Sequence, residues 1–297
     1  MGGGAPQLKA AGGSARDADR MTTSDEPRPL PPESTGDAPG RGRLAGRRIA
    51  VVGAGTAPGP GDEQPIGNGR AMAVLAAREG AVVTCVDRDE AAAGVTAAWI
   101  TSEGGTAPVV VADVARPEAC ESLVADAVAA MGGLDGLVLN VGIGGGRGVA
   151  GTSVDDWDRV LAVNLRSHFL VSRAALPHLG AGSSIVFISS IAGIKAGSRI
   201  PAYDTSKAAL LGLSRSIGLE AAKAGVRSNV VLPGLIDTPL GRWATAGRPS
   251  RGTTGVPLGR QGTGWEVANS VVFLLSDEAA YITGQALAVD GGLSQLR

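Results

Sequence analysis

Tyr203 and Lys207 are the residues whose types and spacing most directly suggest chemistry. The chain has only two tyrosines and four lysines in 297 residues, and a lysine falls four positions after a given tyrosine by chance in only about 1 to 2% of cases. Residues 202–223 have a helical pattern, in which positions i and i+4 share one face. A free phenol titrates near 10, and a cation within about 4 to 6 Å lowers such a pKa by about 1 to 3 units. The pair could therefore form a phenol that exchanges protons near neutral pH. Taken without the rest of the chain, however, the pair is explained more readily by a surface helix with a solvated lysine.

Ser190 and Asn164 are two other polar residues at notable positions. Ser190 follows the apolar run 185–188, which is typical of a buried strand. A hydroxyl at the carboxyl end of a parallel strand faces the crevice where open α/β sheets bind ligands. Asn164 interrupts the helical segment 154–179, either as a solvated side chain or as a kink that frees a carbonyl.

In order and spacing, Asn164, Ser190, Tyr203 and Lys207 resemble the catalytic tetrad of the short-chain dehydrogenase/reductase family. The resemblance extends from about Arg47 to Leu293. It implies that Ser190 binds the substrate oxygen and that Tyr203 is the general acid or base. It also implies that Lys207 lowers the pKa of Tyr203 and holds the nicotinamide ribose, while Asn164 anchors a water that links Lys207 to solvent.

A glycine-rich turn follows the first predicted strand. The family has the spacing G-x-x-x-G-x-G, but here a ten-residue insertion, 57–66, separates Gly53 from Gly67-Asn68-Gly69. An alternative set, Gly55, Gly59 and Gly61, fits the spacing but puts Pro65 at the fourth position of the next helix, where proline is disfavoured. We expect Gly53, Gly67, Asn68 and Gly69 to bind the pyrophosphate at a helix N-terminus, with the insertion beside the adenosine and pyrophosphate half of the cofactor.

Cofactor choice depends on the end of the second predicted strand. Asp87 lies 18 residues after Gly69, close to the roughly 20 expected for a ribose-binding acid. A carboxylate there repels a 2′-phosphate, which favours NAD over NADP. Arg88 opposes this preference, because an arginine after this strand can pair with a 2′-phosphate.

The resemblance implies further cofactor contacts at the ends of the later strands. Asp113 would contact the adenine amino group, although it could instead cap the helix that begins near Pro117. The other implied cofactor-binding residues are Val114, Asn140, Gly142, Pro233, Gly234, Ile236 and Thr238, together with Tyr203 and Lys207 of the tetrad.

Alternating strand and helix patterns over about 250 residues predict one α/β domain, 47–297. We expect a single doubly wound, Rossmann-type parallel sheet of about seven strands, in the order 3-2-1-4-5-6 plus a final strand, with helices on both faces. Residues 1–46 are rich in Gly, Pro, Ser and Asp without apolar periodicity, so we expect a disordered extension. Translation could also start at Met21.

Composition excludes several classes of function. The net charge is −1, and the domain has no basic block, which argues against nucleic acid and anionic membranes as partners. No apolar run is long enough for a membrane span. Cys85 and Cys120 show no disulfide pattern, which indicates a cytoplasmic protein. His168 and His178 lack acidic partners at ligand spacing, so we expect no metal.

We therefore expect an NAD-preferring oxidoreductase that acts on small alcohols or ketones and, by resemblance, forms a homo-oligomer, either a dimer or a tetramer. The substrate pocket should be lined by loops 143–149, 191–200 and 235–256. The last loop holds Arg242, Trp243, Arg248 and Arg251, which could meet an acidic substrate but fit a solvated loop more readily. The alternatives are a 3-oxoacyl-carrier-protein ketoreductase, against which Leu219 replaces the expected docking arginine, and a dinucleotide-sensing or scaffold protein without turnover.

Overall fold

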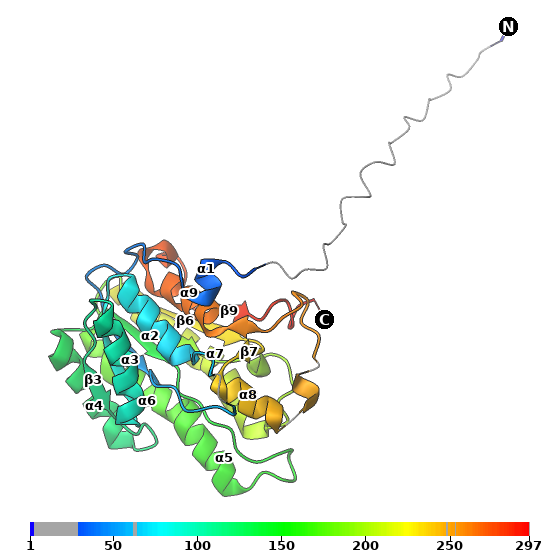
Figure 1. Ribbon diagram of the computed structural model, residues 1–297, viewed down its shortest axis with the longest axis horizontal. Coiled ribbons are helices and arrows are strands. Elements are labelled where there is room, and N and C mark those ends of the chain that lie inside the picture. Colours follow the sequence, from blue (N-terminus) through cyan, green and yellow to red (C-terminus); the bar gives the residue numbers. More distant parts are fainter. Residues whose placement is uncertain (3–28, 62–63, 248, 253, 297) are drawn as a thin grey trace.

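A parallel sheet of seven strands forms the centre of the protein (Figure 1). The computed structural model describes residues 1–2, 29–61, 64–247, 249–252 and 254–296. The strand order is β3-β2-β1-β4-β5-β6-β9, and every neighbouring pair is parallel. The predicted doubly wound order with one added strand is confirmed. The strands are β1 (Arg48–Val52), β2 (Val82–Asp87), β3 (Val109–Val111), β4 (Gly136–Leu139), β5 (Ser184–Ile188), β6 (Arg227–Pro233) and β9 (Ala286–Val289), while β7 (Ile236–Asp237) and β8 (Gly262–Thr263) pair separately.

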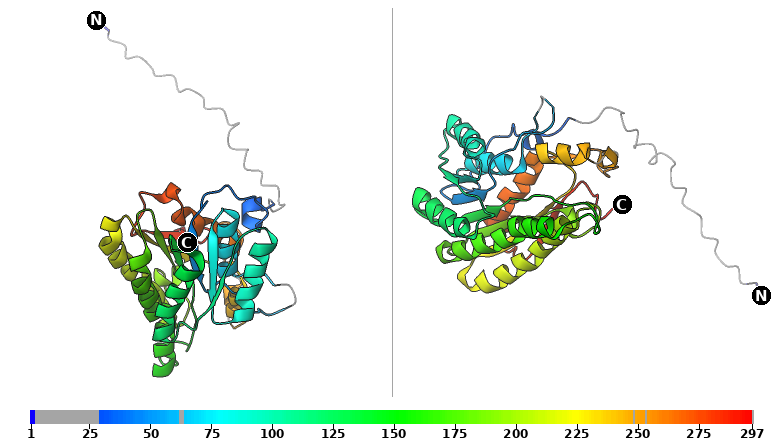
Figure 2. Two further views of the ribbon diagram at one scale, coloured as in Figure 1. Left: turned by 90° about the vertical axis from the view of Figure 1, so that its left-hand side faces the viewer. Right: turned by 90° about the horizontal axis from the view of Figure 1, so that it is seen from below.

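Two layers of helices cover the sheet, and Figure 2 (left) shows one on each side. One face carries α2 (Asn68–Arg78), α3 (Glu90–Ser102) and α9 (Gly264–Leu275), and the other carries α4 (Pro117–Met131), α6 (Ser167–Ala175) and α7 (Pro201–Ala221). Because both faces are covered, the strands are apolar throughout rather than alternating. In β1, for example, Ile49 and Val51 pack into one core, and Ala50 and Val52 pack into the other.

Shorter elements connect this framework. The predicted helix start near Pro117 is confirmed, since α4 begins at Pro117. The helix stops at Gly132, which has a left-handed φ of 73°. The remaining elements are α1 (Pro32–Thr35), α5 (Val154–Leu161), α8 (Pro239–Ala246), the π-helical turn η1 (Ala162–Arg166), and the 3₁₀ turns η2 (Leu176–His178), η3 (Ile191–Gly193), η4 (Ala222–Ala224), η5 (Pro249–Arg251) and η6 (Asp277–Ala279).

The segment before β1 corrects the prediction of a disordered extension up to residue 46. Residues 3–28 lie outside the described ranges, but the segment from Leu30 to Gly46 packs on α2 and α9. Leu44 is fully buried, and the Arg43 guanidinium pairs with the buried carboxylate of Glu79 at 2.7 Å. Gly36 lies so close to Trp265 that a Cβ would meet the indole at 2.2 Å. The prediction of disorder failed because the segment is held by contacts with residues far away in the sequence. Such contacts do not require a periodic pattern of apolar residues within the segment itself.

Among the helices of the described ranges, none combines the length and apolarity that crossing a membrane requires.

Candidate active site

A cavity of about 790 Å³ opens at the carboxyl ends of β4, β5 and β6. Three of the four predicted tetrad residues, Ser190, Tyr203 and Lys207, line it, and Asn164 lies directly behind its wall. All three predicted pocket loops contribute to the lining. The sheet therefore brings together residues that are up to 43 positions apart in the sequence (Asn164 to Lys207).

Asn164 lies in the middle of the π-turn η1, where the predicted helix 154–179 is interrupted. Its side chain is completely buried. The amide oxygen accepts from the Ile143 N–H at 2.8 Å, and the amide nitrogen donates to the Ile143 carbonyl at 2.9 Å and to the Ser206 hydroxyl at 3.0 Å. Asn164 thus fixes the start of loop 143–149 against α7. A π-turn at such a position is a frequent feature of functional sites.

Lys207 is the most buried charged group of the cavity, with an exposed fraction of 3%. Its ammonium donates to the Ile188 carbonyl at 2.9 Å and lies 5.7 Å from the centre of the Tyr203 ring. Gly142 leaves room for it, because a Cβ there would approach Nζ to 3.0 Å. Burial lowers the pKa of Lys207 to about 8, since a low-dielectric site disfavours the charged form.

Tyr203 corrects one step of the sequence reasoning. Part of its side chain faces the cavity, yet burial and, to a smaller extent, the charge of Asp204 raise the pKa of the phenol. A hydrogen bond with Ser190 and the positive charge of Arg251 only partly oppose this effect. The expected lowering by Lys207 is not found, because desolvation outweighs an ammonium that is itself buried and drawn to the Ile188 carbonyl. In the protein alone, Ser190 and Arg251 rather than Lys207 are the groups that favour the phenolate.

The glycine turn has the geometry expected of Gly53, Gly67 and Gly69. Gly53 has a left-handed φ of 88°, which favours glycine. A Cβ on Gly69 would lie 1.8 Å from the Gly53 carbonyl oxygen, so only glycine lets the helix approach the strand this closely. Gly67 is the N-cap of α2, which begins at Asn68. A Cβ on Gly61 would meet nothing, although the φ of 87° at Gly61 also favours glycine.

Two buried polar atoms at this turn lack partners in the described part of the chain. They are the Thr56 hydroxyl oxygen and the Asn68 side-chain oxygen. Buried polar atoms are rarely left unsatisfied, so both are suited to a polar ligand at the turn. Together with the glycine contacts and the start of α2, they fit the pyrophosphate of a dinucleotide.

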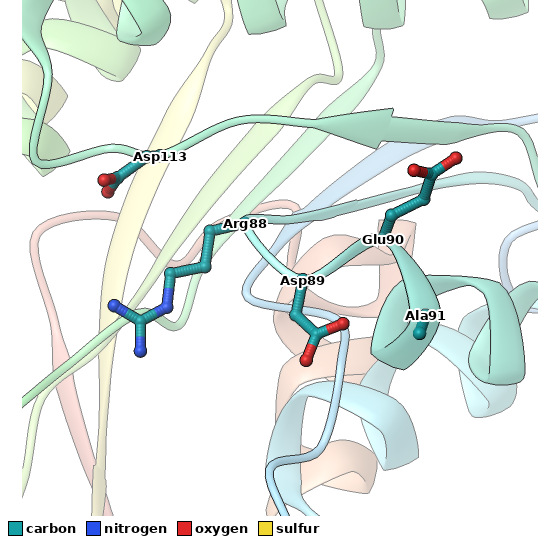
Figure 3. A pocket seen from close by; sticks show the side chains of 5 residues that line it. All are labelled: Arg88, Asp89, Glu90, Ala91 and Asp113. Atoms are coloured by element: carbon teal, nitrogen blue, oxygen red, sulfur yellow. The ribbon is translucent and has the colours of Figure 1, made fainter.

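A second cavity of about 750 Å³ lies where β2 and β3 end, and Figure 3 shows its lining residues Arg88, Asp89, Glu90, Ala91 and Asp113. Beside it, the Asp87 carboxylate accepts from the Gly55 N–H at 2.9 Å and from the Asp89 N–H at 3.1 Å. Asp113 accepts from the Ala115 N–H at 3.0 Å, while Arg116 rather than Asp113 is the N-cap of α4. Three carboxylates thus line the cavity with one guanidinium.

The other predicted cofactor residues divide into two groups. Asn68, Asn140, Gly142, Pro233, Gly234, Ile236 and Thr238 line the larger cavity. Val114 is buried in the core at 6% exposure, so its side chain does not reach either cavity. The Thr238 hydroxyl accepts from the Gly241 N–H at 3.0 Å and caps α8.

The insertion reaches further than the sequence predicted. The Trp243 indole N–H donates to the Pro58 carbonyl at 3.0 Å, and a Cβ on Gly59 would lie 2.9 Å from Pro239 Cα. The insertion therefore crosses from the glycine turn to α8, whose Leu240 and Ala244 line the larger cavity. These contacts with α8 were not predicted, because the sequence carried no signal for contacts with a helix 185 positions away. The expected place beside the adenosine and pyrophosphate half of the cofactor stays a prediction. Asp62 and Glu63 lie outside the described residues.

Arg199 is a residue that sequence reasoning did not single out. Among the described residues it is the one non-glycine with positive φ, at 61°, a conformation that costs an L-residue about 1 to 2 kcal/mol. It lines the larger cavity beside Ser198 and Ile200. Such strain concentrates at functional sites, but no local pattern in the sequence marks it.

The histidines and cysteines of the described ranges form neither a metal site nor a disulfide. No group of three or more His, Cys, Asp or Glu residues there could hold a metal ion. His168 is buried, and burial lowers its pKa to about 3, which keeps the imidazole neutral. Cys85 and Cys120 are both buried and free.

Comparisons with known proteins agree with this geometry. A family model described as enoyl-(acyl carrier protein) reductase matches residues 63–294. The chain is 36% identical to 2-(S)-hydroxypropyl-CoM dehydrogenase 3 of Xanthobacter autotrophicus, over 86% of this chain and 99% of that protein. It is 39% identical to the inactive 2-(S)-hydroxypropyl-CoM dehydrogenase 2 of the same organism, over 76% and 100%.

Solved structures show the same relationship. A short-chain dehydrogenase/reductase from Burkholderia xenovorans superposes with a TM-score of 0.76 at 37% identity, over 85% of this chain and 98% of that one. The chain belongs to the short-chain dehydrogenase/reductase family, a family of oxidoreductases that use a nicotinamide cofactor.

Proposed function

We propose that this protein is an NAD-preferring dehydrogenase/reductase that interconverts an alcohol and its carbonyl compound, with Asn164, Ser190, Tyr203 and Lys207 as its catalytic machinery. The observation that carries the proposal is the arrangement of Ser190, Tyr203 and Lys207 on one cavity wall, with Asn164 holding that wall from behind. The cofactor supplies or accepts the hydride when it is bound.

The protein's own groups account for the proton and for orientation. The Ser190 hydroxyl, in hydrogen-bond contact with Tyr203, is placed to bind the substrate oxygen. Tyr203 then exchanges its phenolic proton with that oxygen as general acid or base. Lys207 holds its ammonium below the Tyr203 ring, where it stabilises the phenolate once substrate and cofactor replace solvent in the cavity. Asn164 keeps Ile143 and the adjoining cavity wall in place.

The preference for NAD rests on charge at the end of β2. Asp87 is fixed by the Gly55 N–H, and Asp89, Glu90 and Asp113 line the neighbouring cavity with Arg88. A 2′-phosphate placed there would meet more negative than positive charge, and like charges disfavour binding. The residues that would hold the cofactor are those of the glycine turn, this carboxylate group and the segment 233–238 at and after the end of β6.

Two other functions stay open. A carrier-protein ketoreductase agrees with the description of the matching family model, but Leu219, which is 83% exposed, takes the place of a docking arginine. A cofactor-binding protein without turnover is favoured by one relative whose name calls it inactive. We infer a homo-oligomer from family resemblance and a cytoplasmic location from the two free cysteines.

The test is absorbance of reduced nicotinamide with a panel of secondary alcohols and ketones, using NAD and NADP in turn. Tyr203→Phe should lower turnover by about 10² to 10⁴ while NAD binding is retained. Tyr281→Phe is the matched control, because the only other tyrosine is fully exposed and should not matter. Full activity of Tyr203→Phe would overturn the assignment, and NAD binding without turnover on any substrate would favour the sensing protein.

A further inference from the structure

The described lining of the larger cavity contains basic side chains but no acidic ones. Five of its lining residues are basic: Lys207 of the tetrad and Arg147, Lys195, Arg199 and Arg251. No described residue that lines it is Asp or Glu. The chain as a whole has 27 basic and 28 acidic residues, so the lining departs strongly from the composition. Clefts lined by one sign of charge attract ligands of the opposite sign.

Arg147 and Arg199 lie close together at this cavity although they belong to different loops. The Gly148 N–H donates to the Arg199 carbonyl at 2.8 Å, which ties loop 143–149 to loop 191–200. Both side chains are exposed, and within the described ranges neither forms an ion pair. Arg199, whose carbonyl accepts this hydrogen bond, is also the residue with the strained φ of 61°.

Nearby carboxylates are engaged elsewhere or do not line the cavity. Asp156 approaches loop 143–149 but accepts from Arg159 at 2.6 Å. Arg242, which the sequence offered as a contact for an acidic substrate, is paired with Asp237 at 2.8 Å and does not line the cavity. Asp204 lies next to Tyr203 on α7 but is not among the lining residues.

Arg251 and Lys195 add positive charge from two other segments. Arg251 donates to the Gly241 carbonyl at 2.9 Å and to the Thr245 hydroxyl at 2.7 Å, which fixes its guanidinium beside α8. The charge of Arg251 lowers the pKa of the Tyr203 phenol, whereas burial and the charge of Asp204 raise it. The Lys195 ammonium donates to the Leu293 carbonyl at 3.1 Å.

We propose that the substrate carries an anionic oxygen group, separate from its carbinol or carbonyl, that Arg147 and Arg199 bind at the mouth of the larger cavity. The inference rests on the proposed function for the reacting end of the substrate. A carboxylate, a sulfonate and a phosphate share the required chemistry, because each accepts charge-assisted hydrogen bonds from guanidinium groups.

The experiment compares substrates matched except for charge. Oxidation of 4-hydroxypentanoate is measured against its methyl ester, and 4-hydroxypentane-1-sulfonate and 3-hydroxybutyryl-CoA are added to distinguish a small acid from a phosphate-bearing carrier. The best anionic substrate should exceed the ester in kcat/KM by about tenfold to a hundredfold, the range of one or two charged hydrogen bonds. Arg199→Gln and Arg147→Gln should each lower that ratio about tenfold, mainly through KM.

Two controls separate charge from structure. Arg199→Gly removes the side chain and relieves the strained φ, so a loss of preference there cannot be attributed to misfolding. Arg215→Gln removes an exposed arginine of α7 that does not line the cavity and should leave the ratio unchanged. An ester used as well as all three anions, or a ratio unaffected in both arginine variants, would overturn the proposal.

The anion site can be tested even if the proposed catalytic function is wrong. If no alcohol or ketone is turned over, calorimetry with NAD and either 4-oxopentanoate or its methyl ester still tests the anion site. Tighter binding of the carboxylate that is lost in Arg199→Gly supports the site without catalysis, and equal or no binding of the two compounds refutes it.

Discussion

Replacing Lys207 by methionine should change how the stability of the protein depends on pH. Burial lowers the pKa of Lys207 to about 8 in the folded protein, whereas an unfolded lysine titrates near 10.4. Because the folded pKa is the lower one, the unfolded chain binds more protons between about pH 8 and pH 10. The contribution of this ammonium is therefore unfavourable below pH 8 and becomes less so as the pH rises.

The magnitude follows from the two pKa values. A difference of about 2.4 units corresponds to about 3 kcal/mol in total, of which about 2.5 kcal/mol is recovered between pH 7 and pH 10. Methionine cannot titrate. The free energy of unfolding of the wild type minus that of Lys207→Met should therefore increase by about 2.5 kcal/mol between these pH values, whatever its sign at pH 7.

Urea unfolding followed by circular dichroism at both pH values measures this difference. Lys223→Met serves as the control, because Lys223 is exposed just after α7 and the same comparison should give little change. A wild-type minus Lys207→Met difference that stays constant, or that falls with pH, would show that the Lys207 ammonium is not desolvated and that the account of its burial is wrong.

Three further predictions concern the cofactor, the insertion and the segment before β1. Asp87→Ser should lower the ratio of kcat/KM for NAD over NADP by about tenfold or more, since it removes like charge from the 2′ position; a wild type that already prefers NADP would show that Arg88 dominates. Trp243→Phe removes the hydrogen bond to the Pro58 carbonyl, so stopped-flow fluorescence should show reduced cofactor leaving about two to ten times faster, and an unchanged rate would mean that the contact does not restrain the cofactor. Burial raises the pKa of Glu79, but hydrogen bonds from Arg43 and Arg41 outweigh it and leave that pKa lowered. Glu79→Gln should therefore destabilise the protein by about 2 to 3 kcal/mol at pH 7, and because a lowered carboxyl pKa contributes stability that is lost as pH falls, thermal unfolding of the two proteins should converge toward pH 3; a constant difference would contradict this.

Patterns within short stretches of the sequence correctly predicted those features of the structure that neighbouring residues determine. The order of the strands follows from apolar runs separated by helical segments, and the cavity follows from polar residues such as Ser190 at strand ends. Gly69 was identified because proline excluded the competing glycines from a helix start. The predictions of Ser190 and Gly69 use residues within about twenty positions of one another, whereas the strand order also needs the rules for right-handed crossovers and doubly wound sheets.

The failures depend on contacts between distant segments. Gly36 packs against Trp265, and Pro58 is bonded to Trp243, and neither pairing leaves a period or a spacing in the sequence. The pKa of Tyr203 was misjudged for a related reason. Counting charges along one helix face considers the attraction of Lys207 but omits the desolvation that the rest of the fold imposes on both groups.

The π-turn at Asn164 shows that the wall of the larger cavity depends on one residue of chain length. A π-turn is an α-helix with one residue added, and each helical residue turns the chain by about 100°. The extra residue lets α5 and α6 both keep their apolar sides on the protein while Asn164 turns inward between them; Val160 and Val171 are both buried. Deleting a single residue from 162–166 would restore a regular α-helix. Either Asn164 or the buried side of α6 would then have to rotate toward solvent. The inward position of Asn164 and the buried side of α6 therefore both depend on the same added residue.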